Sequence, residues 1–350
     1  MSILIKSGKI ITASETYVAD ILIEGETIQQ IGRDITSPGA EIIDAQGKLV
    51  MPGGVDPHTH LELPMFDTVS SDDHYTGHKA AAFGGTTTAL DFINFDSKPL
   101  LENVAAWHRK ADAKAAIDYG FHMNMTQFDE EVGADIPRLV AEGITSMKVF
   151  TAYNGRLRLD DGNIFRVMRI AKDNGMLVMI HAENGDVIDI LVKEALEEGK
   201  RSPIWHAKTR PAWGAVEAVL RGSALAAQAG ASLYVVHMNA AGEADQLAYA
   251  RKKGLPIMGE TCPQYLLLDD RCYLADGFEG AKYVCCPPLR PASDAPELWR
   301  ALTSGQLQTV ATDHCPFYFA GQKELGRELF TSIPSGLPGV EARLALLYTY

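Results

Sequence analysis

The sequence has few cysteines, no long apolar run and no excess of positive charge. Its five cysteines form no C-x-x-C pair, and their odd number in a chain of 350 residues predicts reduced, packed thiols. No stretch approaches the roughly 18 consecutive apolar residues of a membrane helix, and the first ten residues lack the pattern of a signal peptide. These absences predict a cytoplasmic protein. The net charge of −13, from 32 basic and 45 acidic residues, argues against nucleic-acid partners, and the missing apolar run against a membrane.

The composition is that of a globular protein with a sizeable core. Hydrophobic residues make up 46% of the chain and charged residues 22%, far from the composition of disordered proteins. The length is typical of two domains, or of one large barrel with an appendage. The first fifty residues contain short β-rich runs at 3–5 and 9–12 around a turn at Gly8, and at 20–24 and 27–31. This pattern predicts a small sheet.

From residue 53 onward, apolar strand-like runs alternate with helical patterns such as 103–116, 162–174, 214–229 and 241–253. The eight runs lie at 54–60, 86–93, 117–124, 146–151, 177–182, 232–237, 256–260 and 308–312. Eight such repeats predict an α/β fold of the (β/α)8 barrel type, whose chemistry lies at the C-terminal ends of the strands. A doubly wound sheet is the alternative, but no glycine-rich phosphate loop follows the first run.

The predicted domains are 1–52, part of a small β-sandwich, and 53–350, the barrel. The apolar helical pattern at 340–350 has no C-cap or polar tail, and no later strands complete the N-terminal half-sheet. We therefore expect the native chain to continue past Tyr350, with further strands of the sandwich there.

Several predicted strands end in residues that bind metals. His58 and His60 are two positions apart, so a strand directs both side chains to the same face. His181, His237 and Asp313 end three further strands, and a barrel gathers such ends at one mouth. Imidazole and carboxylate are ligands of zinc and related metals. A pair of surface histidines is the plainer interpretation of H-x-H alone, but the five positions together indicate one metal site or two.

Lys148 lies inside the apolar run at 146–150, where an unpaired ammonium is costly to bury. One interpretation is a lysine whose end reaches solvent. The other is a neutral amine that adds CO2 and becomes a carbamate, an anion that can bridge two metals. Composition alone favours the first interpretation.

Seven motifs resemble the dihydropyrimidinase/hydantoinase branch of the amidohydrolase superfamily. They are HTHLE (58–62), SMKVFTAY (146–153), HAENGD (181–186), YVVHM (234–238), GETCPQYLLL (259–268), PPLR (287–290) and ATDHCPF (311–317), in the order of the family. The resemblance implies a binuclear, usually zinc, centre in a TIM barrel that carries a small β-sandwich. It also implies a homotetramer that acts on a small cyclic ureide.

Matched to the family, His58, His60, the carboxylated Lys148 and Asp313 would bind the buried metal, and His181 and His237 the second. A water that bridges two cations has a lowered pKa and supplies hydroxide at neutral pH. The resemblance implies that Asp313 then carries the proton to the leaving ring nitrogen. It makes Tyr153 the donor to the developing oxyanion.

The family opens a dihydropyrimidine or a hydantoin ring to an N-carbamoyl amino acid, and it holds the ring by main-chain groups that match Cys286 and Ser335. Both residues differ from those most common in the family, which leaves the natural substrate open. Allantoinase and dihydroorotase types are alternatives, but Glu62 stands where dihydroorotate enzymes have an arginine. Leu63 and Phe66, with Met65 between them, could form an apolar gate for the exocyclic substituent of the substrate, or only an exposed loop.

A non-catalytic scaffold of the same branch is the alternative of another class. Such a scaffold has no need of a full ligand set, whereas all six ligand positions are filled here. We expect no chemistry from His74, His78, His108, His122 and His206, and at most a supporting role for His314. The sequence therefore predicts an enzyme, in pyrimidine degradation or in hydantoin use.

Overall fold

The computed structural model describes residues 1–350, which divide into two compact units, Met1–Gly54 and Val55–Tyr350. The first unit is a mixed sheet with the strand order β3-β2-β1-β4, and β5 also pairs with β1. Its strands are β1 Ser2–Ile11, β2 Thr16–Glu24, β3 Thr27–Gly32, β4 Glu41–Asp44 and β5 Leu49–Val50. The described residues of this unit form one sheet, so the predicted sandwich stays a prediction.

The turn predicted at Gly8 is wrong, because β1 continues through this position as one strand. The register between β1 and β2 shifts between Ile5 and Gly8, and Ser7 has a φ of 58°. Such a bulge bends a strand without ending it. The backbone N–H of Ser7 stays satisfied, because it donates to Asp20 Oδ1 at 2.8 Å.

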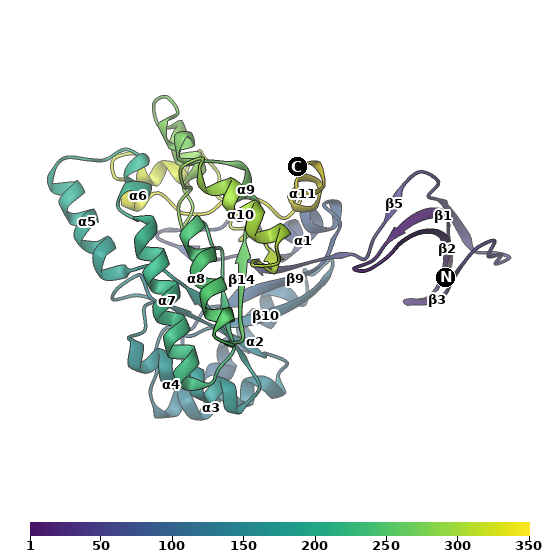
Figure 1. Ribbon diagram of the computed structural model, residues 1–350, viewed down its shortest axis with the longest axis horizontal. Helices are drawn as coiled ribbons and strands as arrows, with labels where there is room; N and C mark the ends of the chain where they lie inside the picture. The colour runs from purple at the N-terminus through teal and green to yellow at the C-terminus, as the bar shows by residue number, and fades with distance from the viewer. The chain divides into compact units, whose positions relative to one another are not determined.

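The second unit is an eight-stranded parallel barrel, which confirms the predicted fold class (Figure 1). The strands neighbour one another in chain order from the first to the last. They are β6 Gly54–Thr59, β9 Thr86–Ile93, β10 Asp118–Asn124, β11 Ser146–Phe150, β12 Leu177–His181, β13 Leu233–Val235, β14 Ile257–Thr261 and β15 Thr309–Val310. The ring is nearly closed, because Thr59 pairs with His314 just beyond β15 and His60 N–H donates to His314 O at 2.8 Å.

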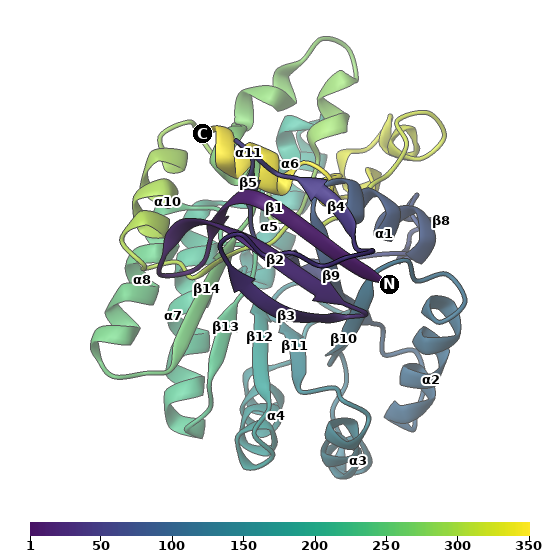
Figure 2. The same cartoon turned by 90° about the vertical axis from the view of Figure 1, so that its right-hand side faces the viewer.

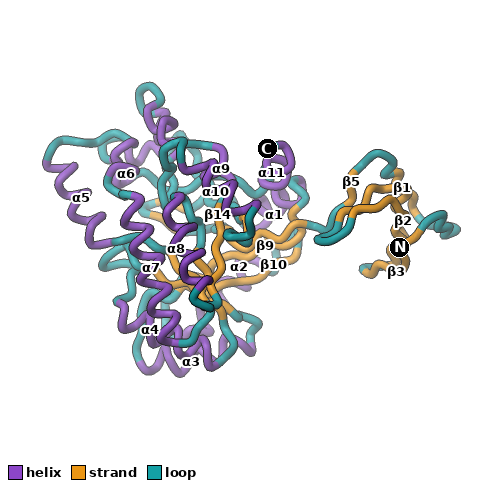
Figure 3. The backbone as a smooth tube through the Cα atoms, in the orientation of Figure 1, coloured by secondary structure: helices purple, strands orange, loops and turns teal.

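Helices alternate with these strands and surround them (Figure 3). The α-helices are α1 His74–Phe83, α2 Leu100–Ala111, α3 Glu130–Ala141, α4 Asp161–Asp173, α5 Gly185–Glu197, α6 Ile204–Lys208, α7 Ala212–Ala229, α8 Ala241–Lys252, α9 Pro263–Leu267, α10 Asp294–Thr303 and α11 Arg343–Thr349. Four 3-10 helices lie at Asp270–Leu274, Glu279–Tyr283, Lys323–Gly326 and Phe330–Ser332. A short hairpin of β7 Pro64–Met65 and β8 Thr68–Val69 follows the first barrel strand. None of these helices combines the length and the apolar character that crossing a bilayer requires.

Short polar side chains start several of these helices. Asp73, Asp129, Asp160 and Asn184 each accept a hydrogen bond from a backbone N–H in the first turn of the helix that follows. These bonds satisfy donors that have no partner within the helix. Because three of these caps follow the ends of β10, β11 and β12, they also fix how the chain leaves the C-terminal edge of the barrel.

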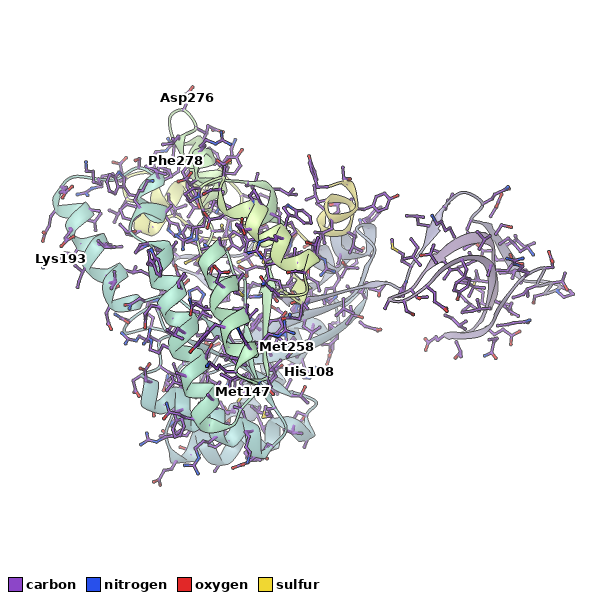
Figure 4. The ribbon with its side chains drawn as sticks, viewed as in Figure 1. His108, Met147, Lys193, Met258, Asp276 and Phe278 are labelled. Carbon is purple, nitrogen blue, oxygen red and sulfur yellow. The ribbon has the colours of Figure 1, made fainter.

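The core has two layers, one on each side of the strands. Met147 and Val149 of β11 are fully buried among helix residues, whereas Lys148 between them faces the inside of the barrel. Figure 4 places Met147 within the molecule and Lys193 on the outer side of α5. Inside the barrel, an apolar cluster of Phe92, Met179, Tyr234, and Val236 forms a floor. The site that follows lies against this floor.

Candidate functional site

The C-terminal ends of five barrel strands bring the predicted metal ligands together, and Figure 2 shows β11, β12 and β13 of these side by side. His58, Lys148 and His181 belong to β6, β11 and β12, while His60, His237 and Asp313 follow β6, β13 and β15. His237 and Asp313 have positive φ angles of 39° and 53°. Residues other than glycine rarely adopt this backbone, and here it turns both side chains away from the strand direction.

Three of these side chains converge on one point. Asp313 Oδ1 lies 3.1 Å from His58 Nε2 and also 3.1 Å from His60 Nε2. Burial alone would raise the pKa of Asp313, but His58, His60 and Lys148 lower it to about 2. Burial lowers the pKa of both histidines, well below the usual range for His58. An ionised carboxylate and two neutral imidazoles at these distances could hold a metal ion.

Glu260 of β14 orients His58. Its Oε1 lies 2.8 Å from His58 Nδ1 and also accepts from His237 N–H at 3.0 Å. With its proton on Nδ1, His58 presents the Nε2 lone pair to Asp313, which is the arrangement that holds metal-binding histidines in place. Sequence reasoning assigned no role to Glu260, although the GETCPQYLLL motif contains it.

His181 and His237 form a second group of side chains whose nitrogens point at each other. His181 Nδ1 lies 3.0 Å from His237 Nε2. On the other side of the ring, His181 Nε2 lies 2.9 Å from Glu183 Oε2. Burial would raise the pKa of Glu183, but the contact with His181 and the charges of Arg210 and Arg290 lower it to about 2. The ionised Glu183 therefore accepts from His181 Nε2–H and leaves the Nδ1 lone pair free, a role that sequence reasoning also missed.

Lys148 lies between the two groups of candidate ligands, the first with His58, His60 and Asp313 and the second with His181 and His237. Its Nζ is 3.0 Å from His58 Nε2 and 4.3 Å from the centre of the Phe92 ring. The residue is only 2% exposed, so its end does not reach solvent, and no carboxylate lies within ion-pair distance. Burial lowers the pKa of this amine. A buried lysine without an anionic partner is well placed for a reaction that removes its positive charge.

These residues fit a metal centre of two ions. The lone pairs of His58, His60 and Asp313 point at one another, and each needs a positive group that the protein itself does not supply. Nδ1 of His237 is buried and has no hydrogen-bond partner, and its Nε2 faces the His181 Nδ1 lone pair. Neutral imidazoles and carboxylates at these distances favour zinc or a similar divalent cation.

A cavity of about 520 Å³ opens onto these groups. Every predicted site residue lines it except His58, which is fully buried behind His60 and Asp313. Leu63, Met65 and Phe66 also line the cavity, and Phe66 is 47% exposed. The loop predicted as a gate therefore lies beside the cavity.

The predicted substrate-binding residues are side by side. Tyr153, with a φ of 67°, donates its hydroxyl hydrogen to Cys286 Sγ at 2.9 Å. Cys286 Sγ in turn lies 3.4 Å from Glu183 Oε2, and burial raises the pKa of this thiol to about 12. Ser335 also lines the cavity, and its backbone N–H points to Met65 Sδ at 3.2 Å.

Glu62 and His314 do not face the cavity. Glu62 pairs with Lys114 at 2.9 Å and is not among the lining residues, so its charge does not by itself exclude an acidic substrate. His314 Nε2 contacts Asp72 at 2.9 Å, and its Nδ1 accepts from Gly339 N–H at 3.0 Å. Of the histidines without an assigned role, His206 does line the cavity, where its Nε2 contacts Cys285 O at 2.8 Å.

Comparisons with known proteins agree with this geometry. The profile of the Amidohydrolase family matches residues 49–342. The chain is 50% identical to the D-hydantoinase of Geobacillus stearothermophilus over its full length, covering 74% of that protein. It is 49% identical to the D-hydantoinase of Streptomyces coelicolor, covering 98% of this chain and 75% of that one. The crystal structure of dihydropyrimidinase from Brevibacillus agri has a TM-score of 0.98 and 51% identity, over 99% of this chain and 76% of that one.

Proposed function

The chain belongs to the amidohydrolase family, on its hydantoinase/dihydropyrimidinase branch, and on this premise we propose that it opens the ring of a cyclic ureide. The bond cut is the amide bond of a dihydropyrimidine or a hydantoin, and the product is an N-carbamoyl amino acid. The observation that carries this proposal is the convergence of His58 Nε2 and His60 Nε2 on Asp313 Oδ1 at the mouth of the barrel.

Six side chains would hold the metal ions in this proposal. His58, His60 and Asp313 would bind one ion, and His181 and His237 the other. Lys148 would bridge the two after its neutral amine attacks CO2, which forms an N–C bond and releases one proton. When bound, two divalent cations supply the positive charge that activates water and polarises the amide carbonyl.

The remaining chemistry belongs to the side chains around the ring. Asp313 takes a proton from the attacking water and passes it to the ring nitrogen as the amide bond breaks. Tyr153 directs its hydroxyl hydrogen to the oxygen on which negative charge develops. The main-chain groups of Cys286 and Ser335 hold the ring in place. Glu183 and Glu260 keep His181 and His58 in the tautomers that can bind metal.

A substrate panel tests this function. Protein loaded with zinc and bicarbonate is assayed with dihydrouracil, hydantoin, 5-substituted hydantoins, dihydroorotate and allantoin. We expect turnover of the neutral dihydropyrimidine or hydantoin rings, loss of activity with a chelator, and return of activity with metal. A metal-loaded protein that opens none of these rings contradicts the proposal. Mass spectrometry of a peptide that contains Lys148, under conditions that keep carbamates intact, checks for the mass of one added CO2.

The same panel tests the gate. Leu63 and Phe66 line the cavity from the loop around the β7–β8 hairpin, so they lie where an exocyclic substituent would pass. Leu63→Ala and Phe66→Ala are expected to raise the rate on bulky 5-substituted hydantoins relative to dihydrouracil. Unchanged relative rates in both variants would show that the loop does not select substrates.

A further inference from the structure

Lys323 is a second buried lysine, and it lies outside the metal centre. The residue is only 2% exposed, and no carboxylate lies within ion-pair distance of its ammonium. A buried charge without an anionic partner is costly and needs full compensation by hydrogen bonds. The hydrogen bonds of the Lys323 ammonium therefore indicate the role of this buried charge.

Three backbone carbonyls surround the Lys323 ammonium. Its Nζ donates to Val284 O at 2.7 Å, to Pro334 O at 2.7 Å and to Gly336 O at 2.9 Å. An ammonium has three hydrogens, so these bonds use all of them. The acceptors belong to the two segments that carry Cys286 and Ser335, and these segments are adjacent, because Gly336 N–H donates to Val284 O at 3.0 Å. Lys323 thus joins the two segments proposed to hold the substrate ring.

One of these bonds acts on a group that faces the substrate cavity. Pro334 C=O and Ser335 N–H are the two ends of one peptide unit. The Ser335 N–H reaches only Met65 Sδ, at 3.2 Å, and a thioether is a weak acceptor. A charge-assisted hydrogen bond to the carbonyl end polarises the peptide and strengthens its N–H as a donor, typically by about 10–30%.

We propose that Lys323 is a positioning residue for the substrate, because it fixes and polarises the Pro334–Ser335 peptide so that Ser335 N–H binds a ring carbonyl oxygen. The inference rests on the proposed function, and it adds a residue that lies behind the cavity wall. Met65 Sδ occupies the position of that oxygen when no substrate is bound. Lys323 touches no reacting atom and acts only through the peptide.

The packing around this cation leaves the two segments little freedom. A Cβ on Gly336 would lie 2.1 Å from Cys315 O, and one on Gly326 would lie 2.4 Å from Ile333 N. The 3-10 helix of Lys323 is also tied to the gate loop, because Gln322 Nε2 donates to Thr68 Oγ1 at 2.8 Å. The ammonium is therefore held at a fixed distance from both segments.

The protonation of Lys323 provides a way to observe its role. Burial lowers the pKa of Lys323 to about 8. The titratable groups that face it are the thiols of Cys285 and Cys315 and the imidazole of His206, and the Phe317 ring lies 5.8 Å away. Above about pH 8 the amine loses its charge and one of its three hydrogens, so the hold on the peptide weakens.

The test compares Lys323→Met and Lys323→Gln with the parent protein, on whichever ring the parent protein opens. We expect KM to rise about tenfold, the effect of one charge-assisted hydrogen bond, with kcat within about twofold and metal content unchanged. The parent KM should also rise above about pH 8, and this rise should be absent in Lys323→Met. Lys282→Met, which replaces an exposed lysine nearby, is the matched control and should leave KM unchanged.

Each result decides between the proposals. An active parent protein with a pH-independent KM, or a folded Lys323→Met with a normal KM, overturns the role of Lys323. A Lys323 variant that loses metal and kcat together also overturns it, because the residue would then support the metal centre. If the variants do not fold, the KM of the parent protein above about pH 8 still decides. A metal-loaded parent protein without activity contradicts the proposed function instead.

Discussion

At the scale of single residues, the site depends on backbone conformations that most side chains avoid. Tyr153, His237 and Asp313 all have positive φ angles, and each such residue costs on the order of 1–3 kcal/mol. The conformation aims each side chain into the barrel mouth, where a residue in a regular strand would point elsewhere. The folded barrel must therefore hold these residues in place, as it does for His237, whose backbone N–H donates to Glu260 Oε1 at 3.0 Å.

Glu183→Gln is expected to weaken metal binding about 10- to 100-fold. The amide can no longer accept from His181 with the strength of a carboxylate, so His181 loses the tautomer and orientation that present Nδ1. Metal content after dialysis against graded chelator measures the effect. Glu243→Gln is the matched control, because Glu243 is equally buried but accepts only from the backbone N–H groups of Asn239 and Ala240. Equal metal affinity in both variants would contradict the role of Glu183.

Tyr153→Phe is expected to lower kcat about 10²- to 10³-fold, because the variant keeps the ring but loses the donor to the developing oxyanion. Metal content should stay at the parent level, since Tyr153 is no proposed ligand. Steady-state kinetics on the preferred ring, with metal analysis of the same sample, checks both points. Cys286→Ala is the companion variant, because it removes the acceptor of the Tyr153 hydroxyl at rest. A nearly normal kcat in Tyr153→Phe with intact metal would exclude the role.

At the scale of elements, the sequence predicts all eight barrel strands within about two residues, because each is a buried apolar run in a chain with regular spacing. β13 and β15 end early, at Val235 and Val310, because the backbone leaves the strand conformation before His237 and Asp313. That turn has no signal in the sequence. The pairing of His58 with Glu260 also could not be predicted, since 202 residues separate them and only the closed barrel brings them together.

Arg343 ties α11 to three barrel strands. It is 2% exposed, and its guanidinium donates to Val55 O at 2.8 Å, Val310 O at 3.1 Å and Thr86 Oγ1 at 3.1 Å. It also lies 3.7 Å from the buried Asp56 carboxylate, whose pKa is raised by burial and lowered by the Arg343 charge. Arg343 therefore supplies hydrogen bonds to two backbone carbonyls and a positive charge close to the buried Asp56 carboxylate.

Arg343→Met is expected to lower the free energy of unfolding by about 3–5 kcal/mol, because it leaves the Asp56 charge without its partner. Urea denaturation followed by circular dichroism measures the change. Arg327→Met is the control, since Arg327 is half exposed and pairs only with Glu324 on the surface, where such a pair contributes about 0–1 kcal/mol. Equal midpoints for the two variants would show that the Arg343 contacts contribute little.

At the scale of the whole molecule, His122 links strands that lie apart in the barrel. From β10, its Nε2 contacts Pro57 O of β6 at 2.9 Å, while its Nδ1 contacts the Ser146 hydroxyl of β11. Donation from Nε2–H to the carbonyl leaves Nδ1 as an acceptor, so the neutral ring satisfies both contacts. Burial lowers the pKa of His122 from 6.5 to about 4. The barrel interior is therefore built for an uncharged imidazole.

This shift predicts that acid weakens the barrel through His122. Between about pH 6.5 and 4 the unfolded chain binds a proton at His122 and the folded chain does not, so stability falls as pH decreases through this window. The full shift corresponds to about 3 kcal/mol at this residue. His122→Gln keeps a donor for Pro57 O but does not titrate, so its unfolding free energy should fall less between about pH 7 and 5. With metal removed from both proteins by a chelator, the difference between their urea midpoints isolates His122, and parallel pH curves would contradict the prediction.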